Sequence, residues 1–314
     1  MTKPRLALVT AGHLSTCPRM LKAADSLAEE GYEVHVVSTR STAWATEADE
    51  ALEAKRRGRW HSTVIDYSRN GGASTYWRSG LRRRIARALA RRTPEVPFGL
   101  ATKAFARVHD ELVFAACATS ADFFFGGTTG GIAAAFEAAM RAGRPYGLDL
   151  EDFFSGEPPG GSHDQKLAER IETEILPGAR FLTAASEAIS AAYTSKYGVV
   201  PETIHNTFSL PEIPPRIESR GSLRLYWFSQ TIGAGRGIEE AIAAAGGAAI
   251  EAELHLRGSI SESYHGVLSA LAKAKAPRLG LAIHPPAPPD EMVSLSRMYD
   301  VGLSLEQGLT MNNR

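Results

Sequence analysis

Short β-rich runs alternate with helical patterns along nearly the whole 314-residue chain, and this alternation limits the fold more than any other feature. A buried strand is expected over 5–12, and the apolar spacing that follows predicts a helix from Pro18 to Glu30. Strand–helix alternation favours right-handed crossovers and a parallel sheet covered by helices on both faces. The chain is therefore predicted to be an α/β protein. Further helices are expected over 101–118, 130–142, 164–176 and 186–196.

The alternation stops once, in the proline- and charge-rich segment 206–222, and then restarts. This segment has no periodic pattern, which is typical of a linker. We therefore expect a Rossmann-like domain over 1–205 and a second one over 223–314. The two domains are expected to face each other across a cleft. Ligands of open α/β sheets bind beyond the carboxyl ends of the strands, so the loops at those ends are the expected site.

Composition excludes several classes of protein. The 35 basic and 35 acidic residues balance, so no overall field attracts nucleic acid. Cys17 and Cys117 are the only cysteines, too few for a disulfide framework, and this suits a reducing cytoplasm. No run approaches the ~20 apolar residues of a membrane helix. We expect a cytoplasmic protein, peripheral at most to the inner face of a membrane.

The stretch FSQTIGAGRGIEEAI runs from a predicted strand through a glycine-rich turn into a predicted helix. Gly233, Gly235 and Gly237 allow the backbone to approach an anion at the helix N-terminus. Arg236 can bind phosphate oxygens through two hydrogen bonds. The turn lacks the third glycine of a dinucleotide fingerprint and the lysine of a P-loop. It predicts a phosphate site, or else a tight connection with an exposed arginine.

Two loops of the first domain follow predicted strands. In TAGHLSTCPRM, Gly12 permits close backbone approach, and His13 is either a general base or a polar surface residue. In GLDLEDFFSGE, Asp149, Glu151 and Asp152 follow a strand, where they line a cleft or cap the next element. Carboxylates in this number also suit a hard cation, but a metal-free site is the favoured interpretation.

Segment 78–92, RSGLRRRIARALARR, contains seven arginines and no acidic residue. Apolar residues such as Leu81 and Ile85 stand between the arginines at helical spacing. A basic amphipathic helix of this kind binds an anionic membrane surface, here through Arg78–Arg92. It can instead bind an acidic partner, or it can be a solvated helix that packs its Leu/Ile stripe on the domain.

The order of these segments resembles a family 4-like glycosyltransferase of the GT-B architecture (glycosyl transferases group 1). FSQTIGAGRGIEEAI is similar to the donor-phosphate loop of this family, with Arg236-Gly237 at the usual Lys-Gly. ELHLRGS is similar to the next strand and its glycine turn, and IHNTF brings an asparagine to the place of an asparagine motif. LAIHPPAPPDEMVSLSRMYDVGLSLE is similar to the stretch that leads to a donor-site glutamate, here Glu306.

The resemblance implies transfer of a sugar, such as a hexose, from a nucleotide-diphosphate sugar to a glycan or lipid-linked acceptor. It implies retention of configuration, no cofactor and no obligatory metal, and a role in cell-envelope or exopolysaccharide synthesis. The residues that it places in the site are the catalytic Asp149, Glu151, Asp152 and Glu306, the donor-phosphate residues Gly233, Gly235, Arg236 and Gly237, and the cleft residues Gly12, His13, Asn206, Arg257 and Gly258.

The chain also departs from the family pattern. Glu151 stands where the family commonly has a histidine, and Gln230 and Thr231 stand where it has a further arginine. The family continues beyond the last predicted strand, so we expect a C-terminally truncated chain with an incomplete second domain, which is an inactive fragment if the missing part is essential. A nucleotide-sugar epimerase on the same fold and a non-catalytic nucleotide-sugar-binding protein are the alternative functions.

Overall fold

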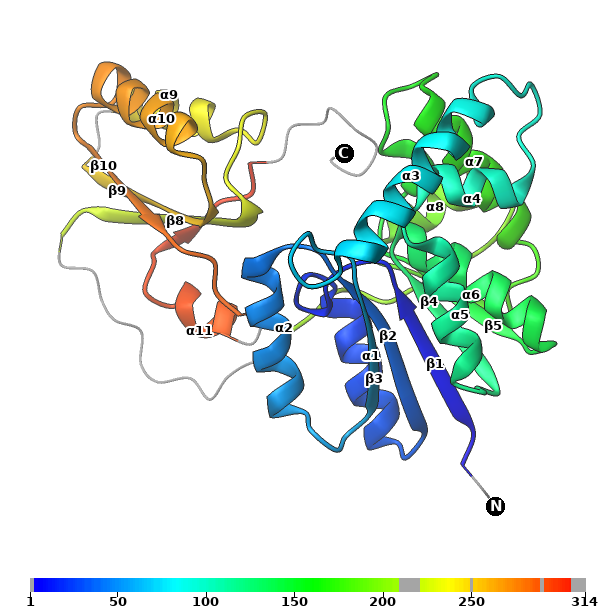
Figure 1. The fold of residues 1–314 in the computed structure, drawn as a ribbon. Coiled ribbons are helices and arrows are strands. Elements are labelled where there is room, and N and C mark those ends of the chain that lie inside the picture. The colour runs from blue at the N-terminus through cyan, green and yellow to red at the C-terminus, as the bar shows by residue number, and fades with distance from the viewer. Residues whose placement is uncertain (1–2, 209–220, 249–250, 289–290, 306–314) are drawn as a thin grey trace. The chain divides into compact units, whose positions relative to one another are not determined.

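The computed structural model describes residues 3–208, 221–248, 251–288 and 291–305, and it separates them into two compact units (Figure 1). The boundary between the units lies between Asn206 and Thr207. Both units are layered α/β structures with parallel strands. The predicted fold class, an α/β chain with two Rossmann-like sheets, is confirmed.

The first unit is built on a seven-stranded parallel sheet in the order β3-β2-β1-β4-β5-β6-β7. Its strands are β1 (Arg5–Thr10), β2 (Glu33–Arg40), β3 (His61–Asp66), β4 (Phe123–Gly127), β5 (Tyr146–Leu150), β6 (Phe181–Ala184) and β7 (Glu202–Thr203). Its helices are α1 (Pro18–Glu29), α2 (Ala43–Lys55), α3 (Ala73–Ala90), α4 (Phe98–Phe105), α5 (His109–Ala118), α6 (Thr129–Ala142), α7 (His163–Ile175) and α8 (Glu187–Tyr197), and the short 3-10 turns are η1 (Leu14–Thr16) and η2 (Phe154–Gly156).

The strands of the first unit have apolar residues on both faces, because helices cover both sides of a parallel sheet. In β1, the side chains from Ala7 to Thr10 are all fully buried. Helix α6 packs against β1 and β4 with little space between backbones. A Cβ atom at Gly131 would lie 2.5 Å from the carbonyl oxygen of Val9. Glycines at the start of α6 therefore bring this helix close to the sheet.

The strand order of the first unit reverses between β1 and β4, which is the place where open α/β sheets bind ligands. Thr128 lies between β4 and α6 there and has a φ of +63°, a conformation that few residues other than glycine adopt. Its hydroxyl oxygen accepts a 3.0 Å hydrogen bond from the backbone N–H of Ala11. The loops after β1 and β4 are thus tied together at the carboxyl edge of the sheet.

The second unit is a smaller parallel sheet in the order β10-β9-β8-β11. Its core contains Trp227, Leu254, Leu256 and residues of the two helices that pack on that face. The elements are β8 (Leu223–Thr231), α9 (Ile238–Ala248), β9 (Ala252–Ser259), α10 (Glu262–Lys275), β10 (Leu279–His284), α11 (Met292–Ser296) and β11 (Val301–Gly302).

Two local differences from the sequence expectation have clear causes. The helix expected over 101–118 is two helices, α4 and α5, because Ala106 has an extended backbone between them. Helix α2 was not expected from the sequence. It begins after Thr42 and buries only Ala45, Asp49 and Leu52, so its apolar periodicity is weak. No helix of the described chain is long and apolar enough to cross a membrane.

Candidate functional site

The carboxyl end of β5 holds a buried ion pair. Asp149 is 3% exposed, and the guanidinium of Arg19 donates to both of its carboxylate oxygens, Nε to Oδ2 at 2.7 Å and Nη2 to Oδ1 at 2.5 Å. The hydroxyl of Thr183 donates a further 2.6 Å hydrogen bond to Oδ1. Arg19 also donates to the carbonyl oxygen of Ile204. This pair joins α1, β5, β6 and the segment after β7, so Asp149 holds these four parts of the first unit together.

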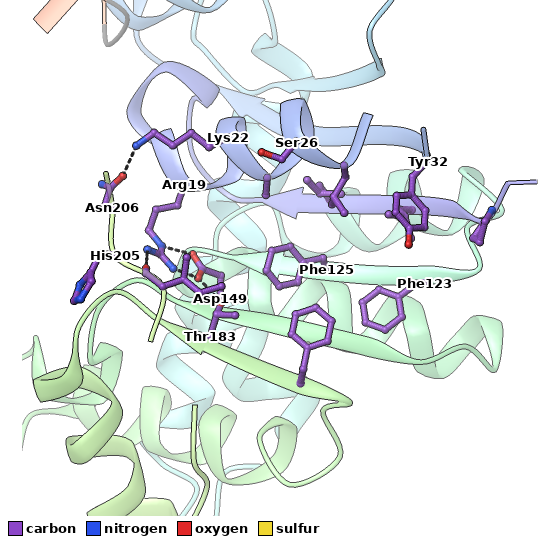
Figure 2. A pocket seen from close by; sticks show the side chains of 17 residues that line it. Arg19, Lys22, Ser26, Tyr32, Phe123, Phe125, Asp149, Thr183, His205 and Asn206 are labelled. Atoms are coloured by element: carbon purple, nitrogen blue, oxygen red, sulfur yellow. Dashed lines mark hydrogen bonds and ion pairs between the residues drawn. The ribbon is translucent and has the colours of Figure 1, made fainter. Parts of the chain in front are cut away.

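Next to this pair lies a cavity of 610 Å³ within the first unit. Figure 2 shows the polar side chains of Arg19, Lys22 and Asn206 at one end, with Phe125 and Phe123 farther along. The ammonium of Lys22 donates to Oδ1 of Asn206 at 2.7 Å. Ligand cavities are commonly lined by apolar side chains with a few polar groups that fix the orientation of the ligand. The polar end of this cavity, beside Arg19 and Asp149, is the part that belongs to the candidate site.

Three carboxyl groups after β5 have pKa values above their ordinary range. Burial, with the negative charges of Asp152 and Asp149, raises the pKa of Glu151 to about 7. Burial is also the main cause that raises the pKa of Asp152 and of Glu157. A carboxyl group with a pKa near neutrality can both donate and accept a proton under physiological conditions. Glu151 is therefore a candidate acid–base group at the carboxyl edge of the first sheet.

A buried carboxylate holds the loop that carries these acids. Glu172 of α7 is 1% exposed and accepts hydrogen bonds from the hydroxyls of Tyr193, at 2.7 Å, and Tyr197. It also accepts a 3.3 Å bond from the backbone N–H of Ser155 in η2. The carbonyl oxygen of Asp152, 3.1 Å away, is a second acceptor for the Tyr193 hydroxyl. The backbone after β5 is thus fixed by α7 and α8.

The loop after β1 is packed rather than open. His13 is 6% exposed, its Nδ1 lies 2.8 Å from Oδ2 of Asp49, and its Nε2 lies 2.9 Å from the backbone N–H of Ser41. Both ring nitrogens are engaged, so this geometry favours a structural role over that of a general base. A Cβ atom at Gly12 would lie 2.8 Å from the Sγ atom of Cys17. Burial raises the pKa of that thiol to about 11, so Cys17 stays protonated.

In the second unit, β8 leads into the glycine turn and α9 as the sequence indicates. Gly235 and Gly237 have φ values of +76° and +75°, a region that favours glycine. A Cβ atom at Gly237 would lie 2.3 Å from the carbonyl oxygen of Leu305, whereas Gly233 borders open space. The exposed Arg236 donates a 3.1 Å hydrogen bond from Nη1 to the hydroxyl of Ser229. The turn thus presents backbone amides and one cation together.

Arg257 lies at the end of β9 and is 8% exposed. Its Nε donates a 2.9 Å hydrogen bond to the hydroxyl of Tyr226, and its Nη1 donates another, also of 2.9 Å, to the carbonyl oxygen of Pro285. Gly258 follows, and a Cβ atom there would lie 2.3 Å from the carbonyl oxygen of Ser229. Arg257 therefore joins β8 to the segment after β10, and Gly258 lies close to the part of β8 that precedes the glycine turn.

The structure thus gathers the predicted residues in two groups. Gly12, His13, Asp149, Glu151, Asp152 and Asn206 lie at the carboxyl edge of the first sheet, and Gly233, Gly235, Arg236, Gly237, Arg257 and Gly258 lie at that of the second. Glu306 lies outside the described residues. In the described part of the chain, no group of three or more His, Cys, Asp or Glu side chains has the geometry to hold a metal ion.

Sequence reasoning missed the residues that position the site. Arg19 lies in a helix and Thr183 in a strand, and nothing in the local pattern links either one to Asp149. Glu172, Tyr193 and Tyr197 look like ordinary helical residues in the sequence. One available signal was overlooked, the run GGTTGG at 126–131, which follows a predicted strand and opens a predicted helix.

No family model matches the sequence, and no curated protein matches it either. Several solved structures are similar in fold. Sucrose-phosphate synthase from Thermosynechococcus elongatus has a TM-score of 0.60 at 10% identity, covering 98% of this chain and 77% of that chain. HepE from Anabaena, in complex with UDP and glucose, has a TM-score of 0.59 at 14% identity, covering 96% of this chain and 73% of that chain.

A glycosyltransferase from Rickettsia africae has a TM-score of 0.57 at 10% identity, covering 97% of this chain and 73% of that chain. These relatives combine two Rossmann-like domains in the GT-B architecture. Their likeness extends over both sheets described above, because almost the whole chain is covered in each comparison. The chain has the GT-B fold.

Proposed function

We propose that this protein is a glycosyltransferase that moves a sugar from a nucleotide-diphosphate sugar to an acceptor. The observation that carries this proposal is the glycine turn of the second unit. It places two left-handed glycines and the exposed Arg236 at the N-terminus of α9. A solved structure with the same fold is in complex with UDP-glucose. In this proposal, the donor diphosphate binds to the glycine turn, residues 233–237.

The chemistry requires negative charge to be stabilised on the leaving diphosphate as the glycosidic bond breaks. Unpaired N–H groups and the partial positive charge at a helix N-terminus favour an anion. Arg236 adds a full positive charge, since only a neutral serine hydroxyl accepts from it among the described residues. The turn therefore supplies stabilisation without a metal ion, and a metal-independent reaction with no cofactor is part of the proposal.

The acceptor side is assigned to the carboxyl edge of the first sheet. The pKa of about 7 lets Glu151 take a proton from an acceptor hydroxyl or hydrogen-bond to a sugar hydroxyl. Its neighbour Asp152 adds a second polar acceptor, and Arg19 with Asp149 fixes the strand end below them. A glycan or lipid-linked acceptor, retention of configuration and membership of family 4 complete the proposal. The proposal also includes a location at the inner, cytoplasmic face of a membrane, where the enzyme would meet a lipid-linked acceptor.

The donor assignment is tested by nucleotide binding. Thermal shift with a panel of nucleoside diphosphates and nucleotide-sugars identifies the base, since a ligand that binds only the folded state raises Tm. Calorimetry with the best ligand then compares Arg236→Ala with Arg278→Ala, which removes an exposed arginine elsewhere in the second unit. Loss of one charge-assisted contact is expected to weaken binding by about 1.5–3 kcal/mol for the first variant only. Equal affinity in both variants would place the diphosphate elsewhere.

The transfer reaction is tested by product release. A transferase frees nucleoside diphosphate in step with glycosylated acceptor, whereas a nucleotide-sugar epimerase converts its donor without an acceptor. Mass spectrometry of the nucleotide pool, with and without an acceptor library, separates these two activities. Donor binding without turnover in any mixture would favour the non-catalytic alternative.

A further inference from the structure

Helix α3 exposes its large apolar side chains. Four residues at spacings of four form one stripe along the helix, and each of them is at least half exposed. They are Trp77 at 67%, Leu81 at 60%, Ile85 at 52% and Leu89 at 50%. We call these four residues the α3 stripe. An exposed, continuous apolar stripe of this size marks an interaction surface rather than a solvated helix.

The same helix packs on the first unit through small side chains. Ser79, Ala86 and Ala90 are its buried residues, and α4 lies along this side. The alternative in which the Leu/Ile stripe packs on the domain is therefore wrong. The reason is that Ser79 and the alanines let α3 approach α4 closely, so its large residues face outward.

The arginines of α3, and Arg91 and Arg92 just after it, differ in their contacts. Arg83 donates to the carbonyl oxygen of Ala104 in α4. Arg82 pairs with Asp110 and Glu111 of α5, and Arg87 pairs with Asp164 of α7. These contacts attach the helix to its neighbours. A second set is exposed and forms no ion pair with any described residue, and it consists of Arg78, Arg84, Arg91 and Arg92.

Positive charge continues past the end of the helix. Arg91 and Arg92 line a surface pocket together with Lys166 and Arg170 of α7, and Glu95 is the one acidic residue in its lining. Arg170 donates to Glu174, so the remaining three cations dominate the pocket. The local charge is visible at His163, where burial and then the charges of Arg87 and Arg91 lower the pKa.

We propose that the α3 stripe binds an anionic lipid surface, with the helix lying in the plane of the interface. The apolar side chains enter the boundary between headgroups and acyl chains, and the unpaired arginines contact anionic headgroups. This combination of an apolar stripe and flanking arginines is the one that interfacial helices use. An acidic protein surface is disfavoured because it would leave the stripe in water. The proposal does not rest on transfer activity, since lipid binding is measured without any sugar.

The test is co-sedimentation of the purified chain with vesicles of phosphatidylcholine alone or mixed with phosphatidylglycerol. The chain is expected to bind the anionic vesicles, and binding is expected to fall as salt rises beyond the level at which the Debye length is about 8 Å. Leu81→Ser with Ile85→Ser is expected to reduce partitioning by at least about ten-fold, because apolar area no longer leaves water. Arg84→Gln is expected to reduce partitioning onto the anionic vesicles about five-fold, because one positive charge near the surface is lost.

Matched controls come from other surfaces of the same unit. Phe114→Ser removes a side chain that is 77% exposed on α5, and Arg57→Gln removes an exposed arginine between α2 and β3. Both controls are expected to bind vesicles as the unchanged chain does. All substituted residues are exposed, so each variant is expected to keep the Tm of the unchanged chain. A loss of vesicle binding at unchanged Tm is then not a loss of folding. The fluorescence of Trp77 reports insertion directly, because Trp77→Phe should abolish most of the blue shift on binding.

Several results would overturn the proposal. Equal binding to neutral vesicles, or binding to neither kind, would remove the anionic lipid surface. If vesicle binding survives Leu81→Ser with Ile85→Ser, the α3 stripe does not enter the membrane. Charge would then be the only attraction, which favours an acidic partner. A dimer in solution that these two substitutions dissociate, without vesicle binding by either form, would make a second copy of the chain the occupant.

Discussion

Replacing Glu151 by glutamine is expected to stabilise the first unit at alkaline pH and to leave its stability unchanged in mild acid. The cause is the burial of Glu151 beside Asp152 and Asp149, which raises its pKa from 4.5 to about 7. Between these two values the folded chain keeps a proton that the unfolded chain has released. Stability from this group is therefore full below pH 4.5 and is lost as pH rises through 7.

The size of the effect follows from the two pKa values. They differ by 7 − 4.5 = 2.5 units. Each unit corresponds to about 1.36 kcal/mol, so the ionised carboxylate costs the folded first unit about 3 kcal/mol at pH values above 7. Glutamine keeps the shape and the hydrogen-bonding groups of the protonated acid, so Glu151→Gln is expected to recover most of this free energy.

The assay is urea unfolding, followed by tryptophan fluorescence from about pH 5 to about pH 8.5. Trp227 belongs to the second unit, so the measurement uses a Trp227→Phe background to follow the first unit alone. The remaining tryptophans, Trp44, Trp60 and Trp77, all belong to the first unit. Glu30→Gln, which removes an exposed carboxylate from the first unit, is the control.

The expected curves for Glu151→Gln and the unchanged protein differ by less than about 1 kcal/mol near pH 5 and separate by about 3 kcal/mol near pH 8.5. The control should not show this separation. A constant offset across the whole range would mean that Glu151 is ionised throughout. A stabilisation that grows toward acid would mean that its pKa is lowered, and either result would refute the reasoning from burial and like charge.

Three further predictions concern folding of the two units. Arg19→Met leaves a buried carboxylate without its cation, so it should lower the free energy of unfolding by about 3–5 kcal/mol in urea titrations, and a loss below about 1 kcal/mol would contradict the buried pair. Tyr193→Phe removes a donor to Glu172 and should cost about 1–3 kcal/mol while speeding amide exchange after β5; unchanged exchange would argue against a positioning role. Gly237→Ala should destabilise the second unit by more than about 1 kcal/mol because of its left-handed backbone, whereas Gly247→Ala, in open space on α9, should stabilise it by about 0.5–1 kcal/mol. Similar thermal shifts in these last two variants would count against strain at the turn.

The architecture was predictable from the sequence because its signals are local. Alternating strand and helix patterns predict a parallel sheet, and the break at 206–222 falls close to the division between the two units. The glycine turn was readable for the same reason, since a left-handed backbone needs glycine at that position in the chain. The positions of the strand ends then follow from the parallel order of each sheet.

The contacts that define the candidate site were not predictable, because they join distant segments. Arg19 and Asp149 are 130 residues apart, and Tyr193 meets Glu172 across two helices. The α3 stripe shows a second limit. Leu81 and Ile85 have the same spacing whether they point into the domain or away from it. Only the small residues on the opposite side of the helix, in contact with α4, determine the direction.

The hydrogen bonds around Glu172 have a consequence for the speed of any reaction at the neighbouring carboxyl groups. A loop held by a buried acid and two tyrosines resists movement when charge moves nearby, because each shift would break a buried hydrogen bond. The dipoles around Glu151 are therefore already oriented before a substrate arrives. Under the proposed function, proton transfer at Glu151 would therefore need little reorganisation of these dipoles, because they are oriented when the chain folds.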